Sequence, residues 1–286
     1  MKDLSHLRTG AGCAWFEVAL GSGKTNTAIL RFIKSAVLER YQEFDSAVAD
    51  YQTEPRKSGI SFSGDVLRGF YEYPPVELKA LLKTRRRDHT LDTCPYCGYP
   101  RAPDTLDHFL PKEDWPEYAI FSDNLVPQCR SCAPIKGAKC FSAEENQSLY
   151  LHPMYSAALA TLRFKIDVTI ASGKPMFSPS FSVPDSITNE DEHRINLHLK
   201  SLKIRARIMD YCNEHYRHWI RIAQSKHCNI RSILASRLSE KECNPYPNNW
   251  ATAFYQGVLA NPHVVRDLQR HVVKKAATPP GVHRFI

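Results

Sequence analysis

Two pairs of cysteines enclose a polar stretch in the middle of the chain. Residues 94–137 read CPYCGYPRAPDTLDHFLPKEDWPEYAIFSDNLVPQCRSCAPIKG. In a Cys-x-x-Cys pair, both thiolates can hold one side of a tetrahedral zinc ion, at ligand distances of about 2.3 Å. Four buried thiols without a metal are the weaker interpretation, because two such pairs seldom coincide by chance. The spacing therefore predicts one structural zinc site with the ligands Cys94, Cys97, Cys129 and Cys132.

Three short motifs lie between and after the cysteine pairs: LDHFLPK at residues 106–112, DNLVP at 123–127 and IKG at 135–137. In order and spacing they resemble the HNH nuclease family, whose ββα-metal motif has an Asp-His pair, an Asn-Leu on a second strand and a Cys-x-x-Cys leading into a helix. They also look like the HNH component of bacterial anti-phage systems such as Septu, which works beside an ATPase. The resemblance covers less than a fifth of the chain.

The resemblance implies a metal-dependent endonuclease, and the residue types suit that chemistry. An imidazole with a pKa near ~6.5 can accept the proton of an attacking water, so His108 is the expected general base. A carboxylate is a hard ligand for Mg²⁺ or Mn²⁺, the expected catalytic ion, and Asp107 is the candidate. Asn124 would hold the loop or the His108 ring by hydrogen bonds.

One position departs from the family pattern. The residue after the last cysteine is usually His or Asn and reaches the catalytic metal, but here it is Ala133, followed by Pro134. Either another residue supplies the ligand, or the domain survives as an inactive zinc-stapled module that binds nucleic acid or protein. His152 is the candidate replacement, and a helix-terminal or core histidine is the equally weighted alternative.

Charge and composition indicate the partner and the compartment. Lys and Arg outnumber Asp and Glu by 38 to 30, for a net charge of +8 and a pI near 9.0. This balance favours a polyanion, with DNA expected before RNA, and an ATPase as a possible protein partner. The ββα site acts on a phosphodiester and not on the sugar, so an RNase, including one that cleaves tRNA, remains the alternative. The expected contacts to nucleic acid are Lys83, Arg85, Arg86, Arg87 and Lys136.

Hydrophobic patterning predicts an α+β fold that is mostly helical. Apolar residues at steps of three and four predict helices over residues 29–51, 75–86, 250–259 and 264–273, and one long helix after residue 188. Residues 162–170 and 176–183 predict a β-hairpin. The expected organisation is an N-terminal helical region (1–90), a zinc-stapled HNH domain (91–155), and the hairpin followed by a C-terminal helical region (156–286).

Two further expectations concern the N-terminal segment. Residues 21–25 read GSGKT, but a phosphate-binding loop needs a Gly five residues before GKT, where the chain has Val18, so an ordinary turn is expected. The chain shows neither a secretory apolar core nor a membrane span, which predicts a cytoplasmic protein with reduced cysteines.

Overall fold

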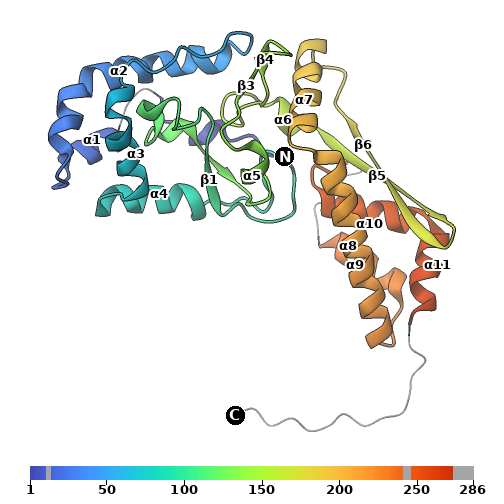
Figure 1. Ribbon diagram of the computed structural model, residues 1–286. Coiled ribbons are helices and arrows are strands. Elements are labelled where there is room, and N and C mark those ends of the chain that lie inside the picture. Colours follow the sequence, from blue (N-terminus) through green and yellow to red (C-terminus); the bar gives the residue numbers. More distant parts are fainter. Residues whose placement is uncertain (11–13, 241–245, 273–286) are drawn as a thin grey trace, which may run out of the picture. The chain divides into compact units, whose positions relative to one another are not determined.

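The computed structural model describes residues 1–10, 14–240 and 246–272 (Figure 1). The fold is α+β and mainly helical, with three two-stranded sheets among the described residues. The chain divides into two compact units: Met1–Arg163 with Ser182–Ile204, and Phe164–Phe181 with Arg205–Ile286. The regions expected over residues 1–90 and 91–155 thus share the first unit, because helices from the former pack on strands from the latter.

The first unit surrounds the cysteine-rich stretch with helices. Its longer helices are α1 (Ala14–Gly21), α2 (Thr27–Ala49), α3 (Gly64–Glu72), α4 (Val76–Arg87) and α7 (Asn189–Ser201). Its short helices are η1 (Ser5–Leu7), η2 (Ser61–Ser63), η3 (Pro116–Tyr118), η4 (Ser122–Asn124), α5 (Ala133–Lys136) and α6 (Ala158–Thr161). Its strands pair as β1 (Thr105–His108) with β2 (Leu125–Gln128), and β3 (Phe141–Ser142) with β4 (Gln147–Ser148). Helix α4 packs against both β1 and β2 and so covers the central hairpin.

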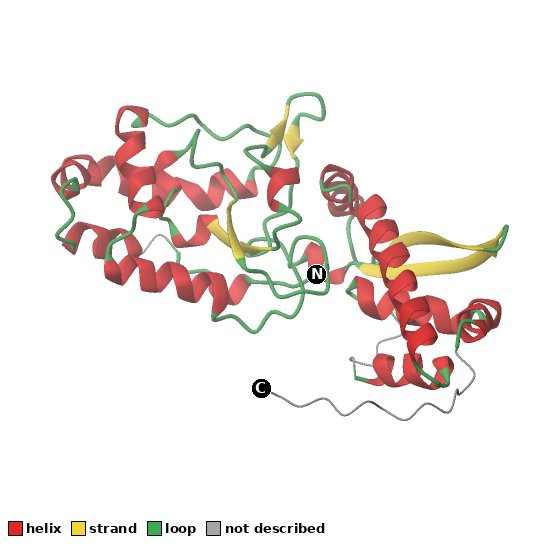
Figure 2. Cartoon of the chain, turned by 60° about the horizontal axis from the view of Figure 1, so that its bottom comes forward, coloured by secondary structure: helices red, strands yellow, loops and turns green. Residues whose placement is uncertain are grey.

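The second unit combines one long hairpin with a helical bundle. The hairpin is formed by β5 (Arg163–Ala171) and β6 (Lys174–Ser182), drawn as paired yellow arrows in Figure 2. The helices are α8 (Ile204–Ser225), α9 (Ile230–Ser239), α10 (Trp250–Ala260) and α11 (Pro262–Arg270). Asn229, Asn249 and Asn261 cap α9, α10 and α11 with their side chains, which explains why these helices begin where they do.

The turn of this hairpin is formed by two residues whose backbone lies in the left-handed region. Ser172 and Gly173 have φ angles of 51° and 73°. A two-residue connection with positive φ at both positions matches the right-handed twist of the flanking strands, so it closes the hairpin without splaying them. The predicted hairpin is confirmed.

The long helix expected after residue 188 is in fact two helices. Helix α7 ends at Ser201, α8 begins at Ile204, and Lys203 between them adopts a φ of 53°. The spacing of apolar residues does not show this break, because Leu202, which lies within it, is itself fully buried. Neither Gly nor Pro marks the position, so the sequence carries no local signal for it.

The GSGKT segment is a turn that joins α1 to α2. The Lys24 ammonium donates to the carbonyl oxygens of Gly69 and Tyr73, at 2.6 and 2.8 Å. These acceptors lie at the C-terminal end of α3, where a cation is favoured by the helix dipole. Lys24 is thus used to hold α3.

Among the described residues, none of the helices combines the length and apolar character that a membrane crossing requires.

The close contact between α10 and β5 gives a stability prediction. A Cβ atom on Gly257 would lie 2.0 Å from the backbone oxygen of Ile166, so either the helix or the strand must move. We expect Gly257→Ala to lower the free energy of unfolding by about 3 kcal/mol. Gly69 on α3 is the control, because a Cβ there meets nothing within 4 Å. Gly69→Ala is expected to be neutral or stabilising by up to ~1 kcal/mol in urea unfolding. Equal effects of the two substitutions would contradict the prediction.

Candidate functional site

The four cysteines of the two pairs form one buried cluster. Their sulfur atoms all lie within 4.8 Å of one another, and Cys97 Sγ is 3.8 Å from Cys129 Sγ. A tetrahedron with zinc–sulfur distances of ~2.3 Å has edges of ~3.8 Å, so the observed separation suits that ion. The cluster is the sole group of its kind found among the described His, Cys, Asp and Glu side chains.

Backbone geometry prepares this cluster for a cation. Gly98 adopts a φ of 71° and donates to Cys94 O at 2.8 Å, which turns the chain around the first pair. The Tyr99 amide donates to Cys97 Sγ at 3.4 Å. Such N–H···S bonds stabilise thiolate over thiol, and burial otherwise raises the pKa of Cys97. The four cysteines can therefore hold a metal ion, and their donor set is the one that structural zinc prefers.

The hairpin β1–β2 places the Asp-His pair next to the cluster. Asp107 pairs with Val126 and His108 with Leu125 in antiparallel register. Asn124, just before β2, bonds the loop after β1: its Oδ1 accepts from the Leu110 amide at 2.8 Å, and its Nδ2 donates to the Leu110 and Tyr118 carbonyls. Of the two roles expected for Asn124, the structure shows the loop contact.

One of the two ring nitrogens of His108 forms a hydrogen bond. Its Nε2 lies 3.0 Å from Ala119 O, and since a carbonyl only accepts, the proton must be on Nε2. Nδ1 then carries the lone pair, and it has no hydrogen-bond partner among the described residues. Burial lowers the pKa of His108 to about 4, so the ring is neutral at pH 7. Tyr71 packs edge-on against it with ring centroids 4.4 Å apart.

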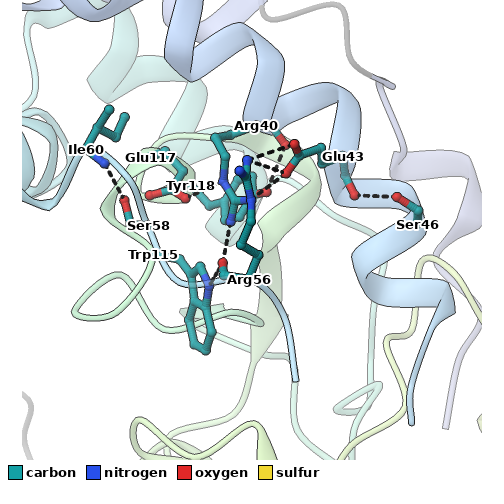
Figure 3. Close-up of polar contacts among 9 residues, drawn as sticks. All are labelled: Arg40, Glu43, Ser46, Arg56, Ser58, Ile60, Trp115, Glu117 and Tyr118. Atoms are coloured by element: carbon teal, nitrogen blue, oxygen red, sulfur yellow. Dashed lines mark hydrogen bonds and ion pairs between the residues drawn. The ribbon is translucent and has the colours of Figure 1, made fainter. Parts of the chain in front are cut away.

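A buried polar network fixes the segment that orients His108 (Figure 3). Arg40 on α2 donates through Nε to Glu117 at 2.8 Å and through Nη2 to Arg56 O at 2.7 Å. The Tyr118 hydroxyl in turn donates to Arg40 O at 2.8 Å. These bonds tie η3 to α2. The next residue, Ala119, supplies the carbonyl that holds the His108 ring.

The Asp107 carboxylate is already paired inside the protein. Tyr96 donates its hydroxyl to Oδ2 at 2.8 Å, and the Lys136 ammonium lies 3.2 Å from Oδ1. Lys136 is completely buried and also donates to the carbonyls of His108 and Phe109, at 3.0 and 3.2 Å. The buried Lys136 ammonium therefore neutralises the charge of the Asp107 carboxylate inside the protein.

This arrangement does not fit a catalytic divalent ion. Mg²⁺ requires near-octahedral oxygen ligands at ~2.0–2.1 Å, and both oxygens of Asp107 have other partners. Ala133, where the family has a ligand, offers only a methyl group. The donors needed for Mg²⁺ or Mn²⁺ are therefore not assembled around Asp107.

The expectation that His152 replaces the missing ligand is not supported by its contacts. Its Nδ1 accepts from the Met154 amide at 3.1 Å, and its Nε2 donates to Asp123 O at 2.9 Å. The ring is fully enclosed, packs on Phe109 at 4.3 Å, and burial lowers its pKa to about 3. With both nitrogens engaged, His152 has no lone pair for a cation. It is a core histidine, the alternative that the sequence also allowed.

The basic residues expected to bind nucleic acid separate into two groups. Lys136 and Arg85 are buried and bonded inside the protein: Arg85 donates to Leu7 O at 3.0 Å and to the sulfur of Met154. Lys83 and Arg87 are exposed on α4. Arg86 is half-buried, and its charge offsets part of the rise that burial causes in the pKa of Tyr71, whose ring lies against His108.

Comparison with known proteins finds a relative in a bacteriophage. The chain is 28% identical over 188 residues to protein ea31 of Escherichia phage lambda. The alignment covers 59% of this chain and 62% of the phage protein. No protein-family model matches the chain, and no solved structure matches it either. The phage protein's name states no activity, so the match identifies a relative without assigning a function.

Three buried polar residues near the site had no role in the sequence interpretation. Asp123 accepts from the amides of Thr9 and Gly10 at 2.8 and 2.9 Å and so ties the N-terminal segment to η4. His198 on α7 donates to Tyr96 O at 2.7 Å, next to the cysteine cluster. The Tyr96 hydroxyl bonds Asp107. Only the position of Tyr96 inside the first Cys-x-x-Cys could have drawn attention to it.

The cysteine cluster predicts one zinc ion per chain. Cys94→Ser should abolish zinc binding and lower the free energy of unfolding, because metal binding is part of the folding free energy. Cys212→Ser is the control: this thiol is also buried but lies on α8, in the second unit. Zinc measured by elemental analysis should stay at one per chain in the control. A folded wild-type protein purified without zinc would contradict the prediction.

The buried Lys136–Asp107 pair predicts a rescue. Lys136→Met leaves the Asp107 charge buried without a counter-ion and should cost about 3–5 kcal/mol in urea unfolding. Adding Asp107→Asn to that variant removes the buried charge and should restore part of the stability. The control is Lys139→Met, three residues on and exposed, which should change stability by less than ~0.5 kcal/mol. The pair is not the reason for the loss if the double variant is less stable than Lys136→Met.

The low pKa of His152 predicts a loss of stability on acidification. The folded pKa is about 3 and the unfolded pKa ~6.5, so the unfolded state binds the proton first as the pH falls. Stability should fall from about pH 6.5 downwards, and at pH 5 this residue contributes a loss of about 2 kcal/mol relative to pH 7. His152→Gln should remove that part of the pH dependence, whereas His218→Gln, at an exposed position on α8, should leave it intact. Urea unfolding of the three proteins at both pH values, with zinc present, measures the difference.

Proposed function

We propose that this protein hydrolyses phosphodiester bonds in nucleic acid, DNA before RNA, with His108 as the general base. The observation that carries the proposal is the state of the His108 ring: Nε2 is held by Ala119 O, and Nδ1 has a lone pair without a partner among the described residues. A general base needs that combination of fixed orientation and a free acceptor. The Asp-His pair on a zinc-stapled hairpin, as in HNH nucleases, supports the same function.

The low pKa of His108 suits a base that is charged only during the reaction. At pH 7 the ring is neutral and can accept the proton of a water attacking phosphorus. A bound phosphodiester brings a negative charge close to the ring, and a nearby opposite charge raises the pKa of an imidazole. Substrate binding would thus make His108 a stronger base at the time when it is needed.

Arg86 is the cation best placed to bind the phosphate. Its charge lowers the pKa of Tyr71 against the effect of burial, and the Tyr71 ring lies against His108 with centroids 4.4 Å apart. A guanidinium can donate two parallel hydrogen bonds to a phosphate, which also orients it. Lys112 is less available, because it forms ion pairs with Glu72 and Glu113 at 2.9 and 3.1 Å.

A second function is favoured by two departures from an HNH site. Ala133 offers no ligand, and Lys136 occupies the carboxylate that would hold a divalent ion. A zinc-stapled module that binds nucleic acid or a protein without cleaving it would need neither group. This binding function is therefore the alternative, and the ATPase partner implied by the resemblance to Septu is compatible with both.

Variants at His108 and Arg86 distinguish the two functions. His108→Ala should reduce the single-turnover cleavage rate by at least ~100-fold with folding, zinc content and binding retained, because only proton transfer is lost. Arg86→Gln should also slow cleavage, while Lys79→Gln, at an exposed position nearer the start of α4, should not. Duplex DNA, single-stranded RNA and tRNA are the substrates, each with and without Mg²⁺ and Mn²⁺. Wild-type protein that binds these polymers but cleaves none of them would establish the binding module instead.

A further inference from the structure

The positive charge of the chain belongs almost entirely to its second unit. That unit contains 15 Lys and Arg residues against 6 Asp and Glu, whereas the first unit contains 23 against 24. The net charge of +8 therefore reflects one basic unit joined to one that is nearly neutral. A charge concentrated on a single small unit attracts a polyanion to that unit.

Many basic side chains of the second unit are exposed and available. Among its described residues, the two ion pairs are Lys165–Asp167 and Arg237–Glu240. The exposed cations that form no ion pair with any other described residue include Arg217, Arg221, Lys226, Arg231, Arg266 and Arg270. Like charges within one unit repel one another, and an external polyanion relieves that repulsion.

Two of these arginines line a hollow beside α11. The cavity has a volume of ≈ 440 Å³ and is also lined by Thr169 and Ile170 of β5. His263, Arg266 and Arg270 are spaced by three and four residues, which places them on one face of the helix. Arg266 donates to His263 Nδ1 at 3.0 Å, and Asp267, the acidic residue in the lining, accepts from the Tyr216 hydroxyl at 2.8 Å. Beyond Asp267 the sequence contains no acidic residue.

We propose that the second unit binds the sugar–phosphate backbone of nucleic acid, with Arg266 and Arg270 of α11 as direct phosphate contacts. The inference rests on the proposed nucleic-acid substrate but concerns binding alone. Most of the exposed cations without an ion pair are arginines, whose planar donors match phosphate oxygens. Binding to an acidic membrane is disfavoured, because a membrane-surface helix needs a free apolar face. The apolar face of α11, formed by Val264, Val265 and Leu268, is buried.

The salt dependence of binding tests this assignment. Anisotropy titrations of the full-length protein use a duplex of about 30 base pairs, without added divalent ions, between ~50 and ~200 mM salt. The double variant Arg266→Gln with Arg270→Gln removes two phosphate contacts, so the slope of log K against log salt should become shallower by about 1.8. The matched control is Lys165→Gln with Arg237→Gln, which removes the same charge from side chains that already have partners. The control should change the slope by less than ~0.5. Equal changes in both double variants overturn the role of α11.

Failure of this inference is distinguishable from failure of the proposed hydrolysis. His108→Ala lies in the other unit and should bind DNA with the wild-type slope. Binding without cleavage would sustain the basic unit and remove the hydrolase. Wild-type protein that binds neither duplex nor single strands at low salt overturns the inference. It is equally overturned if Arg266 and Arg270 control binding to phosphatidylserine vesicles and not to DNA.

Discussion

The convergence of four cysteine sulfurs is the constraint on which the first unit depends. Residues 94–97 and 129–132 are far apart in sequence, yet their sulfur atoms lie within 4.8 Å. Closing that loop costs chain entropy, and a bound metal is the means by which proteins commonly offset such a cost. Within that loop β1 and β2 pair in antiparallel register, and α5 begins directly after Cys132.

The second consequence of this closure is the position of Lys136. Helix α5 is only four residues long and ends at Lys136. The Lys136 ammonium group lies against the Asp107 carboxylate and donates to two backbone carbonyls. A charge with no exposed surface is stable only with such a set of partners. Lys136 thereby holds the strand in place and removes Asp107 from metal chemistry. His108, the next residue, keeps a nitrogen without a partner among the described residues.

The two units divide the chemistry of the chain between them. The first has almost no net charge, and its buried polar groups bond one another around the cysteine cluster, Asp107 and the Arg40 network. The second has most of its described charges on the surface, with few of them paired. A unit that must orient reactive groups benefits from buried, satisfied polar contacts, whereas a unit that attracts a polymer benefits from exposed charge.

Local sequence alone determined the cysteine site, most helices and the long hairpin. Spacing fixes which thiols can share a cation, and apolar periodicity, with capping Asn residues at α10 and α11, fixes most helices, because these signals act over a few residues. Tertiary structure alone decided which polar residues are buried. Lys136, Arg85 and His152 look like surface or ligand residues in the sequence, and each is held inside by partners distant along the chain. The left-handed turn at Lys203 belongs to the same class: the buried Leu202 continues the apolar stripe, and only the φ angle of 53° at Lys203 shows that the helix has ended.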